Sequence, residues 1–235
     1  MIRFDRVSKR YPSGQQALQN INFELSRGEF TFLTGHSGAG KSTLLKLVLG
    51  LDKPSTGIVS VAGHNIVQLS PAKNAARRQI IGAVFQDHQL LSDRTVFGNV
   101  ALPLEISGFS QKELRSRVRA ALDKVGLLRA ENAMPKGLSG GQQQRIGIAR
   151  AIVNSPSIIL ADEPTGNLDE TLSNEIMDLF TQFRSLGVCV LVASHDKRLI
   201  DRFSQRTLVL EEGNLIADIP GGQGETACAK EQTKQ

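Results

Sequence analysis

The sequence predicts an α/β domain built around a parallel β-sheet. Helical patterns over residues 140–153 and 170–186 alternate with apolar strand patterns over residues 157–161 and 188–193. Such alternation is typical of strands joined by crossover helices. The 235 residues are enough for one large domain or two small ones. With 40% hydrophobic and 22% charged residues, a wholly disordered chain is excluded.

The first part of the chain predicts strands. Apolar and polar residues alternate near the N-terminus and again over residues 18–25, on either side of a turn at residues 11–14. A short apolar strand over residues 30–34 leads into a glycine-rich loop, and a helix over residues 43–50 follows it. Gly50 is suited to end this helix, because glycine easily adopts the left-handed conformation found there.

The middle and the end of the chain differ in composition. Helical spacing predicts a helix over residues 111–125 with its apolar residues on one face. Its basic side is suited to acidic partners or simply to solvent. From residue 220 to residue 235 the chain is rich in glycine and polar residues. We therefore expect a folded domain over residues 1–219 and a disordered tail over residues 220–235.

Charge and cysteine content limit the partners and the compartment. Lys+Arg 28 and Asp+Glu 23 give a net charge of +5, which suits an acidic partner, an anionic membrane or an ordinary solvated surface. The two cysteines, Cys189 and Cys228, exclude a disulfide framework and a cysteine-rich metal site. No apolar run reaches the roughly 18 residues of a membrane-spanning helix. The N-terminal residues 1–5 lack the apolar core of a signal peptide. We expect a cytoplasmic protein whose membrane contacts come through a partner.

Residues 35–42 fit the phosphate-loop pattern G-x-x-x-x-G-K-[S/T] at each fixed position, between a strand and a helix. Glycines let backbone N–H groups wrap around phosphate, and the helix directs its positive end at the same anion. Lys41 can reach the β- and γ-phosphates, and Ser42 can ligate Mg²⁺. An ordinary glycine turn is the weaker alternative. The predicted binding residues are Gly35, His36, Ser37, Gly38, Ala39, Gly40, Lys41, Ser42 and Thr43.

The apolar strand over residues 158–161 ends in two acidic residues, Asp162 and Glu163. In a parallel sheet the carboxyl ends of the strands face the ligand crevice. Asp162 is therefore expected beside Mg²⁺, and Glu163 just beyond it, where a base can orient or deprotonate an attacking water. Acids also end strands without a catalytic role, but the phosphate loop in the same chain favours the functional interpretation.

Residues 138–142, LSGGQ, form a second pattern suited to anions. The Ser139 hydroxyl and the amides of Gly140 and Gly141 open a predicted helix whose dipole favours negative charge. A serine N-cap with a glycine turn is the alternative. One chain thus carries two phosphate-type sites.

With these motifs in this order, the chain resembles the nucleotide-binding subunits of ABC systems over about residues 2–218. Residues 35–42 are similar to Walker A, residues 158–163 to Walker B and residues 138–142 to the ABC signature. The resemblance implies an α/β P-loop ABC ATPase fold with a RecA-like core, an N-terminal antiparallel β subdomain and an inserted helical subdomain at about residues 88–155.

The same resemblance implies the remaining site residues and the cofactors ATP and Mg²⁺. Tyr11 is similar to the adenine-stacking aromatic, with a core or turn aromatic as the alternative. Gln86 is similar to the Q-loop glutamine, residues 167–169 to the D-loop and His195 to the switch histidine. The implied catalytic residues are Glu163, His195 and Lys41, the implied metal ligands are Ser42, Gln86 and Asp162, and further nucleotide contacts are Ser139, Gly140, Gly141, Gln142 and Asp169.

The resemblance also implies a head-to-tail homodimer. Each ATP would lie between the phosphate loop of one chain and the signature of the other, which explains why one chain has two anion sites.

Three stretches, residues 32–36, 85–96 and 161–169, are similar to the FtsE family of cell-division ATP-binding subunits. Gln142 departs from the Glu of many such chains. The resemblance implies an FtsX-like transmembrane partner, contacts with other division proteins, and a peripheral position on the cytoplasmic face of the inner membrane at the division site. ATP-driven closure of the dimer would control septal peptidoglycan hydrolysis. The partner groove is expected near residues 86–100, with Leu90, Leu91, Val96 and Phe97 lining it or buried in the core.

Three other functions compete with this interpretation. Lipoprotein-release or macrolide-type ABC exporters share the stretch at residues 161–169 and the same chemistry. A nucleotide-gated scaffold that barely hydrolyses ATP is disfavoured by the intact Glu163 and His195. A DNA-repair ABC ATPase requires a long coiled coil, for which the stretch between Lys41 and Gly137 is too short. We therefore expect no nucleic-acid partner.

Overall fold

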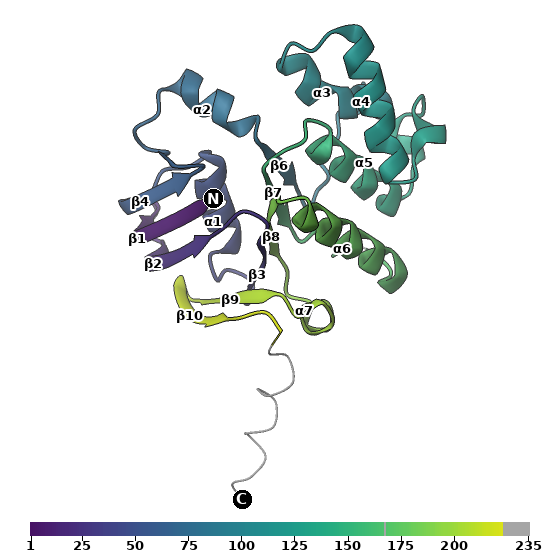
Figure 1. Cartoon of the computed structure of the whole chain (residues 1–235). Coiled ribbons are helices and arrows are strands. Elements are labelled where there is room, and N and C mark those ends of the chain that lie inside the picture. Colours follow the sequence, from purple (N-terminus) through teal and green to yellow (C-terminus); the bar gives the residue numbers. More distant parts are fainter. Residues whose placement is uncertain (167, 223–235) are drawn as a thin grey trace, which may run out of the picture.

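The structure is a computed structural model that describes residues 1–166 and 168–222. Two β-sheets and a group of helices make up the molecule (Figure 1). The first sheet has four strands in the order β2-β1-β4-β5, and its neighbouring strands are antiparallel, which confirms the N-terminal antiparallel subdomain of the expected fold. Its strands are β1 (Ile2–Arg10), β2 (Gln16–Leu25), β4 (Thr56–Val61) and β5 (His64–Asn65).

The second sheet has six strands in the order β10-β9-β3-β8-β7-β6. The strands from β9 to β6 are parallel, and only β10 at the edge runs antiparallel to its neighbour. The carboxyl ends of β3, β7 and β8 therefore meet at one edge, where Asp162 is paired with Ala193. The strands are β3 (Phe30–Thr34), β6 (Ile81–Val84), β7 (Ile158–Asp162), β8 (Cys189–Ala193), β9 (Arg206–Glu211) and β10 (Asn214–Ile219).

Helices cover both faces of the second sheet. The buried leucines of α1 pack in one core with both sheets, whereas a second core joins the other face of the sheet to α3, α4, α5 and α6. The helices α3, α4 and α5 lie together at one side of the molecule (Figure 1). The helices are α1 (Lys41–Leu49), α2 (Pro71–Arg78), α3 (Val96–Ile106), α4 (Gln111–Lys124), α5 (Gly140–Ile152), α6 (Glu170–Ser185) and α7 (Lys197–Phe203), with 3₁₀ turns at Leu128–Ala130 and Pro135–Gly137.

Most of the expected elements are present within one or two residues of their predicted bounds. The helix after the glycine-rich loop spans Lys41–Leu49. Its C-cap is Gly50, which has a φ of 64° and whose N–H donates to the carbonyls of Leu47 and Lys46. The helices α3 to α5 lie inside residues 88–155, so these limits of a helical subdomain stay a prediction that the fold allows. The predicted disordered tail lies outside the described residues from residue 223 onward.

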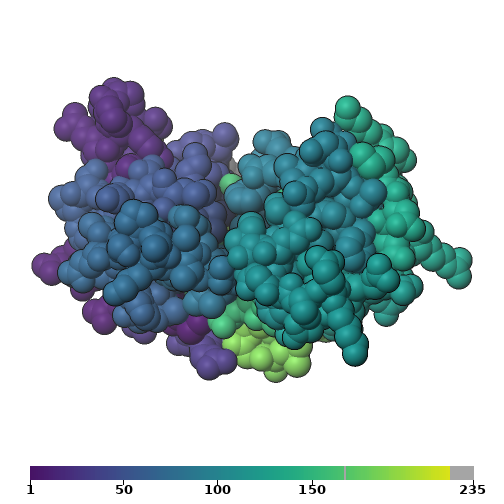
Figure 2. All heavy atoms as spheres, turned by 90° about the horizontal axis from the view of Figure 1, so that it is seen from above, coloured from purple at the N-terminus to yellow at the C-terminus, as the bar shows by residue number. Residues whose placement is uncertain are grey.

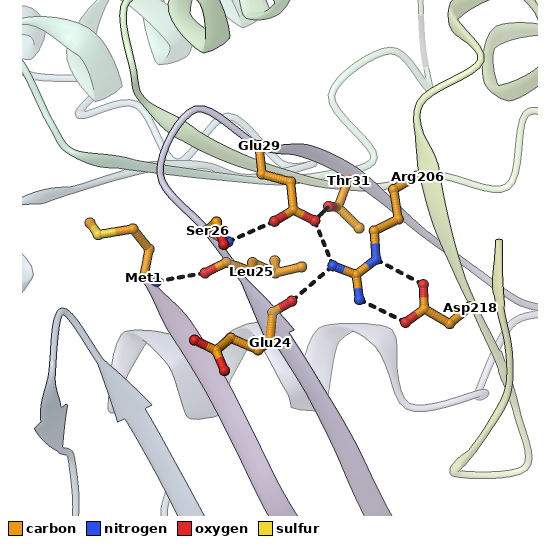
Figure 3. A network of polar contacts seen from close by, with 8 residues as sticks. All are labelled: Met1, Glu24, Leu25, Ser26, Glu29, Thr31, Arg206 and Asp218. Carbon is orange, nitrogen blue, oxygen red and sulfur yellow. Dashed lines mark hydrogen bonds and ion pairs between the residues drawn. The ribbon is translucent and has the colours of Figure 1, made fainter. Parts of the chain in front are cut away.

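A polar clasp joins the two sheets at the end of the molecule away from the glycine-rich loop (Figure 3). Arg206, the first residue of β9, donates to both carboxylate oxygens of Asp218 at 2.8 and 2.6 Å. The same guanidinium donates to the Glu29 carboxylate at 2.5 Å and to the Glu24 carbonyl at 2.8 Å. One arginine thereby fixes the edge strand β10 to β2 and to the start of β3.

Candidate nucleotide-binding site

A pocket of about 610 Å³ lies where β3 runs into the glycine-rich loop. Residues from the N-terminal sheet, from the loop and from the ends of β7 and β8 line it together, although they are far apart in the sequence. The sheet topology explains this, because the carboxyl ends of parallel strands share one edge. The predicted residues in the lining are Tyr11, His36, Ser37, Gly38, Ala39, Gly40, Lys41, Ser42, Thr43, Gln86, Asp162, Glu163 and His195.

The loop conformation requires glycine at two of its fixed positions. Gly35 has a φ of 150°, and a Cβ there would lie 2.2 Å from the carbonyl oxygen of Leu210. Gly40 has a φ of 109°, and a Cβ there would lie 2.6 Å from the carbonyl oxygen of Ala17. Any larger residue would displace the loop from the strands beneath it. Gly35 therefore supports the loop from below and is the one predicted loop residue that does not line the pocket.

Lys41 is the first residue of α1, and its side chain reaches back to the start of the loop. Its ammonium donates to the carbonyl of Gly35 at 2.6 Å and to that of His36 at 3.1 Å. Gly40, the N-cap of α1, offers no side chain to cap the helix. The first N–H groups of α1 therefore have no side-chain cap, and with the nearby ammonium of Lys41 they suit an oxyanion.

Asp162 is a partly buried carboxylate beside the loop. Burial raises the pKa of Asp162, and the negative charge of Glu163 raises it further, while a hydrogen bond from Ser42 and the charges of Lys41 and Lys46 oppose the shift. A bound cation would favour the ionised form. The hydroxyl of Ser42, the amide oxygen of Gln86 and this carboxylate are the hard oxygen donors that Mg²⁺ prefers, so the residues fit the expected metal.

Glu163 has an unusual backbone. Its φ is 47°, a left-handed conformation that costs energy for any residue other than glycine. Its N–H donates to the Ala193 carbonyl at 2.9 Å, and its carboxylate lies 2.8 Å from Nδ1 of His195. The Glu163 side chain is 11% exposed, whereas His195 is 71% exposed. Strain of this kind is concentrated at functional sites, and here it turns a carboxylate into the pocket beside a histidine.

Three residues of the lining were not expected from the sequence, namely Gln15, Ala17 and Lys46. Lys46 follows Ser42 by four residues on α1, so the helical period already placed both on one face. Gln15 and Ala17 lie at the pocket because β1 pairs with β2. This pairing brings together separate segments, so no local sequence pattern predicts the contact of these two residues with the pocket.

The signature residues lie elsewhere in the chain's own fold and do not line the pocket. The Ser139 hydroxyl accepts from the amide of Gln142 at 3.3 Å, and the Gln142 side chain accepts from the amide of Ser139 at 3.0 Å. This capping box starts α5 and leaves Gly140 and Gly141 in its first turn. Asp169 is the N-cap of α6, and its carboxylate accepts from the amide of Leu172 at 2.9 Å. Asn167 lies outside the described residues. One chain therefore holds two separate parts of the expected site.

Comparison with known proteins identifies the family. The family model described as "ABC transporter" matches residues 18–166. The chain is also 56% identical, over 215 residues, to the Cell division ATP-binding protein FtsE of Escherichia coli strain K12, covering 92% of this chain and 97% of that protein. The chain belongs to the FtsE family of ABC ATP-binding proteins. Another FtsE, from Mycobacterium tuberculosis, is 44% identical over 93% of this chain and 95% of its own length.

Solved structures confirm the ABC ATPase fold for this member of the FtsE family. The dimeric structure of the bacterial ABC transporter cassette MJ0796 has a TM-score of 0.87 and 38% identity, covering 93% of this chain and 97% of that one. A dimeric post-hydrolysis state of the same cassette, bound to ADP and Pi, has the same TM-score and 36% identity. These relatives are therefore dimers, and one of them holds the products of ATP hydrolysis.

Proposed function

We propose that this chain is the Mg²⁺-dependent, ATP-hydrolysing subunit of a cell-division ABC complex that contains an FtsX-like membrane protein. In this proposal ATP binding and hydrolysis control septal peptidoglycan hydrolysis. The observation that carries it is a single pocket in which the phosphate loop with Lys41 and the strained Glu163 beside His195 are exposed together. Membership of the FtsE family supports the role in cell division.

The loop amides and Lys41 bind and orient the triphosphate. The ammonium of Lys41 now bonds to two loop carbonyls and is close enough to exchange them for phosphate oxygens. Donors that are already aimed at the γ-phosphate stabilise the charge that grows there as the bond to it breaks. When bound, Mg²⁺ would neutralise charge on the β- and γ-phosphates, held by Ser42, Gln86 and Asp162.

Glu163 is the proposed base. Its carboxylate accepts a proton from the attacking water, and His195 holds the carboxylate in place through the 2.8 Å contact. The left-handed backbone directs this side chain toward the pocket instead of along β7. The carboxylate would thereby be oriented toward a water that attacks the γ-phosphate.

A second copy of the chain would complete each site. Ser139, Gly140 and Gly141 begin α5 away from the pocket, so the chain's own signature does not contact its own triphosphate. In a head-to-tail homodimer, the signature of the partner copy would close over the γ-phosphate, with Asp169 next to it. Dimeric cassettes among the solved relatives support this arrangement.

The change Glu163→Gln tests the proposed chemistry. The amide keeps the size of the side chain and removes the base, so ATP should still bind while turnover falls about 100-fold. The variant should then accumulate as an ATP-bound dimer, which size-exclusion chromatography with mass measurement detects. Glu105→Gln, an exposed carboxylate of α3, is the control and should behave as the wild type. Undiminished turnover in Glu163→Gln would refute the assignment.

The membrane partner is proposed to dock in a groove beside the Q-loop. Seen from above, a hollow separates the N-terminal half from the helical half of the molecule (Figure 2). A groove of about 390 Å³ lies between α2, β6, α3 and α5, with Leu102, Pro103 and the 68% exposed Ile106 in or beside it. These residues differ from the four expected ones, since Val96 is fully buried, Leu90 and Phe97 pack on the core, and Leu91 is 37% exposed.

In the part of the chain that the structure describes, no helix is both long and apolar enough to cross a membrane. The proposed position is therefore peripheral, on the cytoplasmic face of the inner membrane at the division site, held by the FtsX-like partner. Purification of the native complex tests this. An FtsX-like membrane protein in the complex supports the proposal, whereas the permease of a lipoprotein-release or macrolide exporter would assign the chain to that alternative.

A further inference from the structure

A buried cation lies behind the ring of Tyr11. The ammonium of Lys9 is 4.9 Å from the ring centroid, a distance typical of a cation–π contact. Lys9 is only 8% exposed and does not line the nucleotide pocket, whereas Tyr11 does. The cation is therefore on the side of the ring that faces away from the pocket.

Lys9 is held in this position by groups in the segment between α1 and β4. Its ammonium donates to the carboxylate of Asp52 and to the carbonyl of Lys53 at 2.8 Å. The amide of Lys53 also donates to Asp52 at 2.9 Å. Burial acts to raise the pKa of Asp52, but the hydrogen bonds from Lys9 and from the Lys53 amide bring it below its usual value. Asp52 is therefore a permanent countercharge, without which a buried ammonium would be unfavourable.

The hydroxyl end of the ring is fixed as well. The Tyr11 hydroxyl lies 3.3 Å from the hydroxyl of Thr43 in the first turn of α1, beside the phosphate loop. The ring is thus held at its edge by the phosphate-loop helix and on its rear face by Lys9. Only its front face is open to the pocket.

We propose that Lys9, held by Asp52, is a positioning residue that sets the affinity for the nucleotide base. A cation on one face of an aromatic ring draws π-electron density toward itself. The open face then becomes a better stacking surface for an electron-rich purine, because stacking is weakened by repulsion between two negative ring faces. This inference rests on the proposed ATP site and adds a determinant of what that site recognises.

The proposal predicts an effect on the base alone. Lys9 does not reach the phosphate loop, so it should leave the binding of a ligand without a base unchanged. Inorganic tripolyphosphate is such a ligand. A merely structural role of Lys9 would weaken ATP and tripolyphosphate alike, because the loop itself would be disturbed.

The experiment measures dissociation constants of the full chain for ATP, CTP and tripolyphosphate by titration calorimetry. For Lys9→Met we expect ATP to bind about fivefold more weakly, with tripolyphosphate within about twofold of the wild type. The preference for ATP over CTP should fall by a similar factor. Lys53→Met is the matched control, because it removes a neighbouring exposed ammonium and keeps the backbone groups that hold Lys9 and Asp52.

The outcomes separate this inference from the proposed function. If the wild type binds neither ATP nor tripolyphosphate, the proposed function fails. If the wild type binds both, and Lys9→Met weakens both equally or neither, the role of Lys9 is refuted. If thermal unfolding shows that Lys9→Met is not folded, Asp52→Asn is measured in its place. The proposal then requires that Asp52→Asn lose the preference for ATP over CTP by the same factor.

Discussion

At the scale of single residues, Asp162 combines a functional role with a structural cost. It is partly buried at the end of β7, and this partial burial raises the pKa of its carboxyl. The ionised form is thus destabilised until a cation binds. Asp162→Asn removes the charge and keeps the shape of the side chain, so the unliganded protein should melt about 2 °C higher at neutral pH. ATP hydrolysis with Mg²⁺ should fall about tenfold or more, because a ligand of the metal loses its charge. Differential scanning calorimetry and a phosphate-release assay measure the two effects.

The difference in melting temperature between the wild type and Asp162→Asn should depend on pH, because the pKa of Asp162 is raised in the folded protein. Because the folded-state pKa of Asp162 is raised, the folded wild type takes up its proton more readily than the unfolded chain. The wild type therefore gains stability relative to the variant as the pH falls through that pKa. The gap in melting temperature should therefore narrow as the pH falls from neutral toward the usual range of a carboxyl pKa. Asp178→Asn, at an exposed position of α6, is the control, and an equal shift there would contradict this explanation.

Local structure was predictable where the pattern is local. The spacing of Gly35, Gly40 and Lys41 predicted a tight loop before a helix, which the structure shows, and the roles of these residues stay a prediction. The left-handed backbone of Glu163 could not be expected, because it depends on a hydrogen bond to β8, a strand that follows much later in the sequence. The support of Tyr11 by Lys9 and Asp52 was missed for the same reason.

At the scale of elements, amphipathic spacing decided what was predictable. The helices α4 and α6 bury one face each, and both were expected almost residue for residue. Three other helices, α2, α3 and the short α7, were missed. Helix α3 contains Pro103 and is apolar on most sides, which conceals the helical period, and α2 buries only Arg77. The hairpin of β9 and β10 was also missed, because its pairing with the rest of the sheet is a tertiary event.

Arg150 on α5 links this helix to the turn that follows Gln86. After Gln86, the residues His88 and Gln89 are both left-handed, with φ of 57° and 47°. The guanidinium of Arg150 on α5 donates to both of their carbonyls at 2.7 Å. The helix that begins at the signature therefore holds the Q-loop turn in a strained shape. Arg150→Met should release it, giving about tenfold slower ATP turnover and faster amide exchange over residues 86–91.

The matched control lies on the same helix. Arg145 contacts Glu175 and the Val125 carbonyl and has no contact with the Q-loop turn. Arg145→Met should therefore leave amide exchange over residues 86–91 as in the wild type. Equal exchange in the Arg150 and Arg145 variants would mean that the turn is stable without the arginine. Hydrogen–deuterium exchange with mass spectrometry makes the comparison.

At the scale of the whole molecule, the separation of the phosphate loop from the signature favours assembly of two copies in the proposed function. The phosphate loop and the signature helix belong to one rigid architecture, but the signature does not line the pocket. A chain that acted alone would leave the start of α5 without a ligand. The homodimer is therefore a geometric requirement of the proposed chemistry, in which one copy binds the triphosphate and the other closes the site.

If two copies form each site, ATP binding by one copy and formation of the ATP-dependent dimer can be disrupted separately. In the Glu163→Gln background, adding Ser139→Arg should leave ATP binding to the monomer within about twofold, because Ser139 lies outside the chain's own pocket. The ATP-dependent dimer should be lost, because a large side chain at the start of α5 would collide with the nucleotide of the partner copy. Size-exclusion chromatography with light scattering follows the dimer, and equilibrium dialysis follows ATP. The control is Ser116→Arg on the exposed face of α4, which should still dimerise. If Ser139→Arg instead abolished ATP binding by the monomer, the signature would belong to the pocket of its own chain, and the head-to-tail arrangement would be wrong.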